Sequence, residues 1–127
     1  MYKISKEFSF CASHKLEGLP EQHPCSRVHG HNYIVIVELE AQFLSELGFV
    51  VDYRNLTPIK EFIDIYLDHQ HLNDALACNP TAENIAKFLF NTFRKTFPQM
   101  TTISVKETPK TIATYSPMYD ENSEKIG

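Results

Sequence analysis

Residues 25–41 read CSRVHGHNYIVIVELEA and join a group of reactive side chains to a long alternating pattern. From position 29 onward, every second residue is a histidine or an apolar residue: His29, His31, Tyr33, Val35, Val37 and Leu39. A period of two predicts a β-strand, in which residues i and i+2 project from the same face. We therefore expect a strand over 29–41 that carries two imidazoles on one face.

Two imidazoles on one face form half of a metal site, and Gly30 between them adds no bulk. A catalytic zinc site has three protein ligands and one open position. His14 is the best candidate for the third ligand, although it could also be a core histidine with a satisfied hydrogen bond. Cys25 precedes His29 by four residues and could be a fourth ligand or a nucleophile beside the metal.

The segment 2–14 also alternates, with its apolar residues on the parity that ends at His14. This pattern predicts a half-buried strand. Residues 15–28 contain Gly18, Pro20 and Pro24, so we expect a loop there. The two strands are therefore expected to pair as an antiparallel hairpin around this long loop.

The rest of the chain predicts two helices followed by two strands. Pro58 suits the first turn of a helix whose apolar stripe extends to Leu67, and Thr81 is expected to cap a second helix that ends at Pro98. Strands are expected at 101–107 and 111–115, a short strand or extended segment at 48–52, and a loose tail at 116–127.

These elements predict an α+β sandwich, in which a four-stranded antiparallel sheet carries both helices on one face. The 127 residues are expected to form a single domain, 1–127, long enough to bury a core. So small a sheet leaves open edges, and association with further subunits is the expected remedy.

Composition excludes several classes of function. The net charge of −4 offers no broad basic field for nucleic acid. Three cysteines at unlike spacings form no disulfide framework, and we expect Cys11 and Cys78 to be structural. The N-terminus lacks the apolar run of a signal peptide, and the apolar run 33–37 is too short to span a membrane. We therefore expect a soluble, cytoplasmic protein.

Three further side chains could belong to a site. Asp68 and His69 are adjacent at the end of the first helix, where they could either address a site or lie solvated at a helix terminus. Glu107 falls on the apolar parity of its strand. Because an unpaired buried carboxylate is costly, it must either sit at the rim in water or meet a specific partner.

The ordered set of motifs resembles the 6-pyruvoyl-tetrahydropterin synthase family, and most of all its 6-carboxytetrahydropterin synthase branch, which makes a queuosine precursor. The three-residue gap between Cys25 and His29 is similar to that branch, whereas His71 stands where the branch more often has an aromatic or basic residue. The motifs are Phe8-Ser9-Phe10 before His14, Cys25-x-x-x-His29-Gly30-His31, Val50-Val51-Asp52-Tyr53, Leu67-Asp68-His69, Leu72-Asn73, Asn79-Pro80-Thr81-Ala82-Glu83-Asn84 and Glu107-Thr108.

The resemblance implies the tunnelling fold, in which small sheets join in a trimer to form a barrel and two trimers stack into a hexamer. It implies a zinc ion on His14, His29 and His31. It also implies Cys25 as the catalytic base, with Asp68 and His69 as its relay partners. Glu107 would anchor the pterin ring.

The implied reaction converts 7,8-dihydroneopterin triphosphate to 6-carboxy-5,6,7,8-tetrahydropterin, with loss of triphosphate and acetaldehyde. Zinc would act as a Lewis acid that acidifies a C–H bond, and the thiolate would remove the proton. Lys15 and Arg27 are candidate contacts for the triphosphate because of their charge and position. The helix start at Thr81 is a weaker candidate anion site.

Three alternatives remain open from the sequence. Cys25 could complete a closed, structural zinc site together with the three histidines. The same fold could perform other pterin chemistry, such as formation of a pyruvoyl product or aldol cleavage of dihydroneopterin. The chain could also be an interaction module whose histidines bind no metal.

Overall fold

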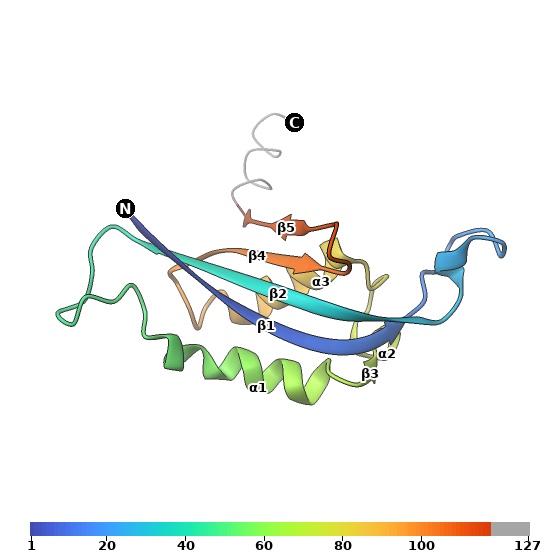
Figure 1. Cartoon of the computed structure of the whole chain (residues 1–127), viewed down its shortest axis with the longest axis horizontal. Helices are drawn as coiled ribbons and strands as arrows, with labels where there is room; N and C mark the ends of the chain where they lie inside the picture. Colours follow the sequence, from blue (N-terminus) through green and yellow to red (C-terminus); the bar gives the residue numbers. More distant parts are fainter. Residues whose placement is uncertain (118–127) are drawn as a thin grey trace.

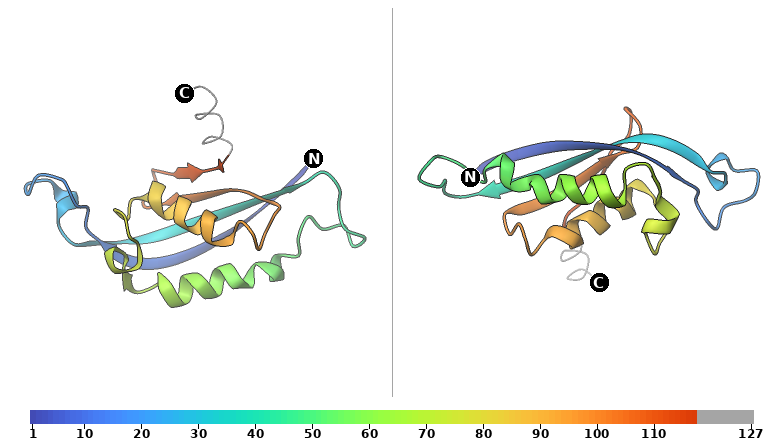
Figure 2. Two further views of the ribbon diagram at one scale, coloured as in Figure 1. Left: turned by 180° about the vertical axis from the view of Figure 1, so that it is seen from behind. Right: turned by 90° about the horizontal axis from the view of Figure 1, so that it is seen from below.

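The computed structural model describes residues 1–117, which form one sheet with its main helices, α1 and α3, against one face (Figures 1 and 2). The strand order in the sheet is β3-β1-β2-β4-β5. The strands are β1 (Tyr2–His14), β2 (His29–Ala41), β3 (Gln70–His71), β4 (Met100–Lys106) and β5 (Ala113–Tyr115). The helices are α1 (Thr57–Tyr66), the short α2 (Leu72–Ala75) and α3 (Ala82–Phe93), with single 3₁₀ turns at Pro24–Ser26 and Tyr53–Leu56.

The two long strands pair as the predicted antiparallel hairpin. Their register runs without interruption from Tyr2 opposite Ala41 to His14 opposite His29. The end of the hairpin that carries His14 and His29 extends beyond β4, and the loop 15–28 projects from this end (Figure 1). This register confirms both strands and their bounds, and it brings three histidines to one end of the sheet.

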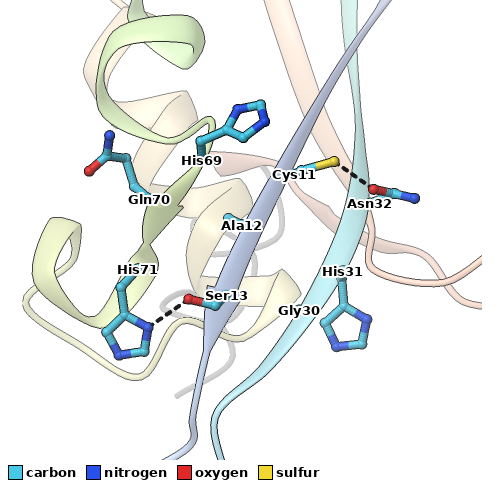
Figure 3. A pocket seen from close by; sticks show the side chains of 9 residues that line it. All are labelled: Cys11, Ala12, Ser13, Gly30, His31, Asn32, His69, Gln70 and His71. Carbon is cyan, nitrogen blue, oxygen red and sulfur yellow. Dashed lines mark hydrogen bonds between the residues drawn. The ribbon is translucent and has the colours of Figure 1, made fainter.

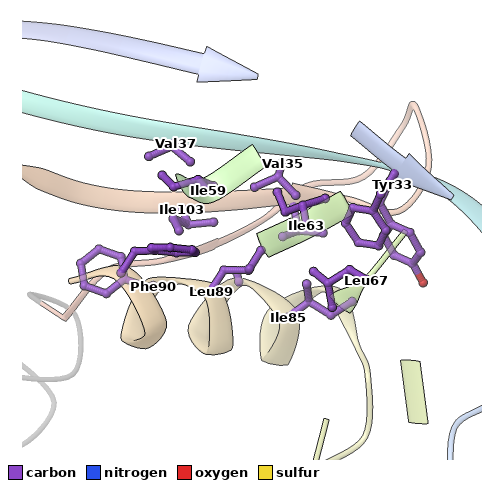
Figure 4. Close-up of a cluster of buried hydrophobic side chains, with 14 of the residues drawn as sticks. Tyr33, Val35, Val37, Ile59, Ile63, Leu67, Ile85, Leu89, Phe90 and Ile103 are labelled. Carbon is purple, nitrogen blue, oxygen red and sulfur yellow. The ribbon is translucent and has the colours of Figure 1, made fainter. Parts of the chain in front are cut away.

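The core lies between the sheet and the two main helices (Figure 4). Alternate residues of β2 point into it, and Tyr33, Val35 and Leu39 are fully buried. Helix α1 has its proline in the first turn as predicted, and the Thr81 side chain caps α3 by accepting a hydrogen bond from the Asn84 N–H. The predicted stripes face the core, with Phe62 and Phe88 only partly buried and Tyr66 exposed at the end of α1.

The sheet has one strand more than predicted. The backbone after α1 turns beside β1, so that Gln70 and His71 pair in parallel with Ala12 and Ser13. Sequence periodicity cannot find a two-residue strand, because its hydrogen bonds come entirely from a distant segment.

Two other expectations need correction. Of the two alternatives for residues 48–52, the strand is wrong; Asp52 has an extended backbone and caps the 3₁₀ turn with a hydrogen bond from the Arg54 N–H. Helix α3 ends at Phe93, well before Pro98. Of the expected tail, Ser116 is buried, while residues 118–127 lie outside the described part of the chain.

Within residues 1–117, no helix combines the length and the apolar character needed to cross a membrane.

We predict that Ile63→Ala lowers the free energy of unfolding by about 2–5 kcal/mol, because it removes a side chain that is 1% exposed and leaves a cavity. Ile65→Ala, on the same helix but 64% exposed, serves as the matched control and should stay within about 0.5 kcal/mol. Urea unfolding of the three proteins measures the difference. Equal losses at both positions would contradict the packing of α1 against the sheet.

Candidate functional site

Four side chains converge where the hairpin ends: His14 from β1, His29 and His31 from β2, and Glu107 directly after β4. Each offers one ligand atom, and these four atoms all lie within 4.8 Å of one another. The β1–β2 register explains the meeting, since it sets His14 opposite His29 and Ala12 opposite His31. The three predicted metal ligands therefore do come together.

Backbone carbonyls orient two of the imidazoles. The Nδ1 atom of His14 lies 2.8 Å from the Pro80 carbonyl oxygen, and Nδ1 of His29 lies 2.7 Å from that of Arg27. A carbonyl can only accept, so each Nδ1 carries the hydrogen and each Nε2 presents a lone pair. This arrangement is typical of metal-bound histidines, whose second nitrogen is held by an outer partner.

The two lone pairs face each other, because Nε2 of His14 lies 2.9 Å from Nε2 of His29. Two acceptors this close need a cation between them, either a proton or a metal ion. Burial lowers the pKa of His14, and the neighbouring His29 and His31 add to this effect, against opposing contributions from the Pro80 carbonyl and Glu107. The neutral form that results is the form that binds a metal.

Glu107 meets specific partners. Its Oε1 atom lies 3.0 Å from Nε2 of His14 and 3.3 Å from Nε2 of His31, and its side chain is 28% exposed. Three imidazoles and one carboxylate form a donor set that suits a tetrahedral zinc ion. The hydroxyl of buried Tyr33 lies 3.0 Å from Nδ1 of His14, and burial together with the charge of Glu107 raises the pKa of this hydroxyl.

Cys25 lies apart from this group. It sits half-buried in the 3₁₀ turn, where its N–H donates to Nδ1 of His23 and its carbonyl accepts from the Leu16 N–H. Among residues 1–117 the group of clustered donors takes Glu107, not Cys25, as its fourth member. The sequence did not predict this contact of Glu107, because it joins strand ends that are far apart in the chain.

The loop after His14 is held by two side-chain amides. Asn73 accepts from the Lys15 N–H and donates to the Lys15 carbonyl, and Asn79 does the same for Glu17. The ammonium of Lys15 lies 3.8 Å from the Glu17 carboxylate, and the Arg27 side chain is exposed. These contacts fix the backbone near the histidines and leave the predicted anion contacts of Lys15 and Arg27 as expectations.

Asp68 and His69 form a pair at the start of the chain segment that leads to β3. Oδ2 of Asp68 lies 2.9 Å from Nδ1 of His69, and Oδ1 accepts a hydrogen bond from the Cys11 N–H. These bonds, that from Cys11 first, lower the pKa of Asp68. His69 has a φ of 58°, a left-handed conformation that costs a non-glycine residue of order 1–3 kcal/mol. Its imidazole is 80% exposed, so it is free to meet a ligand.

An open cavity of about 490 Å³ joins the two groups, because both His31 and His69 line it (Figure 3). Sequence reasoning missed Cys11, Ser13 and Asn32, which also line this cavity. Cys11, which the sequence analysis took as structural, donates its thiol hydrogen to Oδ1 of Asn32 at 2.6 Å. Oγ of Ser13 lies 2.9 Å from Nδ1 of His71. Positions 11 and 13 alternate with the apolar, even-numbered positions of β1, and this alternation could have placed both side chains on the face away from the core.

A second cavity of about 450 Å³ lies on the other side of Glu107. It is lined by residues at the start of α3 and by the segment that enters β5, among them Glu83, Thr111 and Thr114. The carboxylate of Glu107 thus stands between the histidines and this cavity.

Comparisons with known proteins identify the family of the chain. A model of the 6-pyruvoyl tetrahydropterin synthase family matches residues 3–118. The 6-carboxy-5,6,7,8-tetrahydropterin synthase of Synechocystis sp. is 34% identical over 122 residues, which cover 91% of this chain and 93% of that protein. The protein of the same name from Rickettsia bellii is 33% identical over 134 residues, which cover 86% of this chain and 96% of that protein.

A solved structure gives the same result for the fold. The 6-pyruvoyl tetrahydropterin synthase of Caenorhabditis elegans superposes with a TM-score of 0.80 at 26% identity, covering 91% of this chain and 94% of that one. These findings confirm the resemblance drawn from the motifs and the α+β tunnelling fold that it implied.

We predict that His31→Ala, once loaded with zinc, releases the added ion during dialysis, because only two imidazoles and one carboxylate then remain in the cluster. His23→Ala is the matched control, since His23 is exposed and lies outside the cluster. Elemental analysis of both variants and the parent protein gives the zinc content per chain. Full zinc retention by His31→Ala would refute the assignment of this ligand.

Proposed function

The chain belongs to the 6-pyruvoyl tetrahydropterin synthase family, and on this premise we propose that it is a zinc-dependent carbon–carbon lyase. Its substrates would be 7,8-dihydroneopterin triphosphate and one water molecule, and its products 6-carboxy-5,6,7,8-tetrahydropterin, triphosphate and acetaldehyde, as in the formation of a queuosine precursor. The names of the relatives with 30–34% identity support this product. The observation that carries the proposal is the convergence of three imidazoles and Glu107.

His14, His29 and His31 would hold the zinc ion through their Nε2 atoms, two of which are already oriented by carbonyls on the opposite nitrogen. A zinc ion bound there would supply Lewis acidity for the removal of a proton from the substrate. Burial keeps His14 in the neutral, metal-binding form.

The proton transfers fall to Cys25, Asp68 and His69. Cys25 is the proposed base, because it precedes His29 by four residues in the family motif. His69 would shuttle protons while Asp68 holds its ring through Nδ1. Support for this relay comes from the cavity that His69 shares with His31.

We further propose that copies of the chain share each site. His69 lines the cavity beside His31, whereas Cys25 is not among the residues that line it, which supports a site completed by a second copy. A homohexamer built as a dimer of trimers would bring the base of one copy to the relay of another. We place this assembly in the cytoplasm.

Substrate contacts are assigned by charge and position. The Glu107 carboxylate can offer two oxygens to the N–H donors on the edge of a pterin ring, a charge-assisted bidentate contact. Lys15 follows His14 directly, Arg27 is exposed two residues before His29, and both carry the positive charge that a triphosphate needs.

A second candidate is formation of a 6-pyruvoyl product on the same fold, which the similarity to the Caenorhabditis elegans enzyme favours. A structural zinc site closed by Cys25 has less support, because Glu107 occupies the position next to the histidines.

We predict that incubation with 7,8-dihydroneopterin triphosphate yields acetaldehyde and a carboxypterin, identified by mass spectrometry. Cys25→Ala should keep its zinc and lose turnover, because the thiol lies outside the cluster of donors. Cys78→Ala, which changes an exposed thiol, is the control. A pyruvoyl product would select the second candidate, and zinc lost together with the Cys25 thiol would contradict its role as base.

We also predict that Asp68→Asn lowers kcat by about 10²–10⁴, the usual contribution of a general acid–base pair. Asp64→Asn, on α1 and paired with Lys60, is the matched control and should retain full activity.

Cys25→Ala and Asp68→Asn subunits that are unfolded and refolded together should regain activity if the site is shared between copies. Mixed assemblies without any recovered turnover would place both residues in one subunit's site.

A further inference from the structure

We infer that Glu107 is a fourth ligand of the metal when no substrate is bound, and that it leaves the metal when a pterin ring enters the cavity beside it. The inference rests on the proposed function, because it takes the zinc ion and the pterin from there. It adds to that function a second position for the Glu107 carboxylate and a coupling between metal binding and pterin binding.

The first support is the set of contacts that Glu107 makes. Within the described residues its ion-pair partners are His14 and His31, and no lysine or arginine among residues 1–117 pairs with it. One oxygen, Oε1, approaches both Nε2 atoms at 3.0 and 3.3 Å. The Pro80 carbonyl places the hydrogen of His14 on Nδ1, so Nε2 of His14 presents its lone pair to this carboxylate oxygen. A cation shared between the two atoms, either a proton or a metal ion, stabilises such a pair, and a metal in that position would have Glu107 as a ligand.

The second support is the place of Glu107 in the fold. It follows the last residue of β4, and its side chain is partly exposed, so its outer atoms have room to turn. It lines the cavity of about 450 Å³ together with Glu83, Thr111 and Thr114. The same carboxylate therefore borders both the metal position and a space that can admit a ring.

The two positions exclude each other. A carboxylate that coordinates the metal cannot also offer both oxygens to the paired N–H donors of a pterin edge. Binding of the ring must then withdraw Glu107 and open one metal position on the side of the cavity. Thermodynamic linkage makes the effect reciprocal, so the ring weakens metal binding by the same factor by which the metal weakens ring binding.

The test uses the full-length protein loaded with cobalt(II), whose visible spectrum reports the ligands, and a chelator competition that gives the zinc affinity. Glu107→Gln should lower the zinc affinity at least about tenfold, since even outer partners of a metal site contribute 10- to 100-fold, and should change the cobalt spectrum. Glu107→Asp, which keeps the charge, should retain part of the affinity.

Glu83→Gln is the matched control, because Glu83 lines the same cavity but lies outside the cluster of donors. It should leave both the affinity and the spectrum unchanged. If Glu107→Gln matches the parent protein in both measurements, Glu107 is no ligand and the inference is wrong. Circular dichroism of each variant verifies that it is folded.

The exchange itself is tested with pterin that lacks a side chain at C6, so that no reaction can occur. Saturating pterin, verified by equilibrium dialysis, should shift the cobalt spectrum of the parent protein toward that of Glu107→Gln. An unchanged spectrum at saturation would overturn the exchange. These spectra require no turnover, so they can refute the exchange even if the enzyme still forms the carboxypterin. A shifted spectrum from a protein that forms no carboxypterin would count against the proposed function alone.

Discussion

The antiparallel ladder between β1 and β2 is the constraint on which both the core and the site depend. Its register sets His14 opposite His29, and the same register turns Tyr33 and Val35 into the core. A slip by one residue would move every side chain of a strand to the opposite face. It would expose the apolar set and separate the imidazoles at once. Burial of the β2 side chains under α1 and α3 therefore holds the histidines in register, while the Pro80 and Arg27 carbonyls orient two of their rings.

Much of the fold could be predicted from the sequence because it depends on local periodicity. The bounds of β1 and β2, the proline in the first turn of α1 and the cap at Thr81 all follow from neighbouring residues. The meeting of His14, His29 and His31 was also within reach, because two strands joined by one loop pair in few ways. The roles of these residues in a reaction stay predictions.

What could not be predicted depends on segments that are distant in sequence. Strand β3 exists because Asp68 and His69 bond to the backbone of Cys11, more than fifty residues earlier. The contacts of Glu107 and the bond between Ser13 and His71 are of the same kind. Parity indicated which face each residue would occupy. It could not indicate which strand end would lie opposite.

The left-handed backbone of His69 has a consequence for how the protein can change. Glycine adopts a φ of 58° without the steric cost that a histidine bears there, so a glycine at this position would relieve local strain and remove the imidazole from the cavity. If His69 has its proposed role in proton transfer, selection for stability and selection for turnover favour different residues at this position. In a lineage that no longer needed the reaction, position 69 is where we would expect the sequence to drift early.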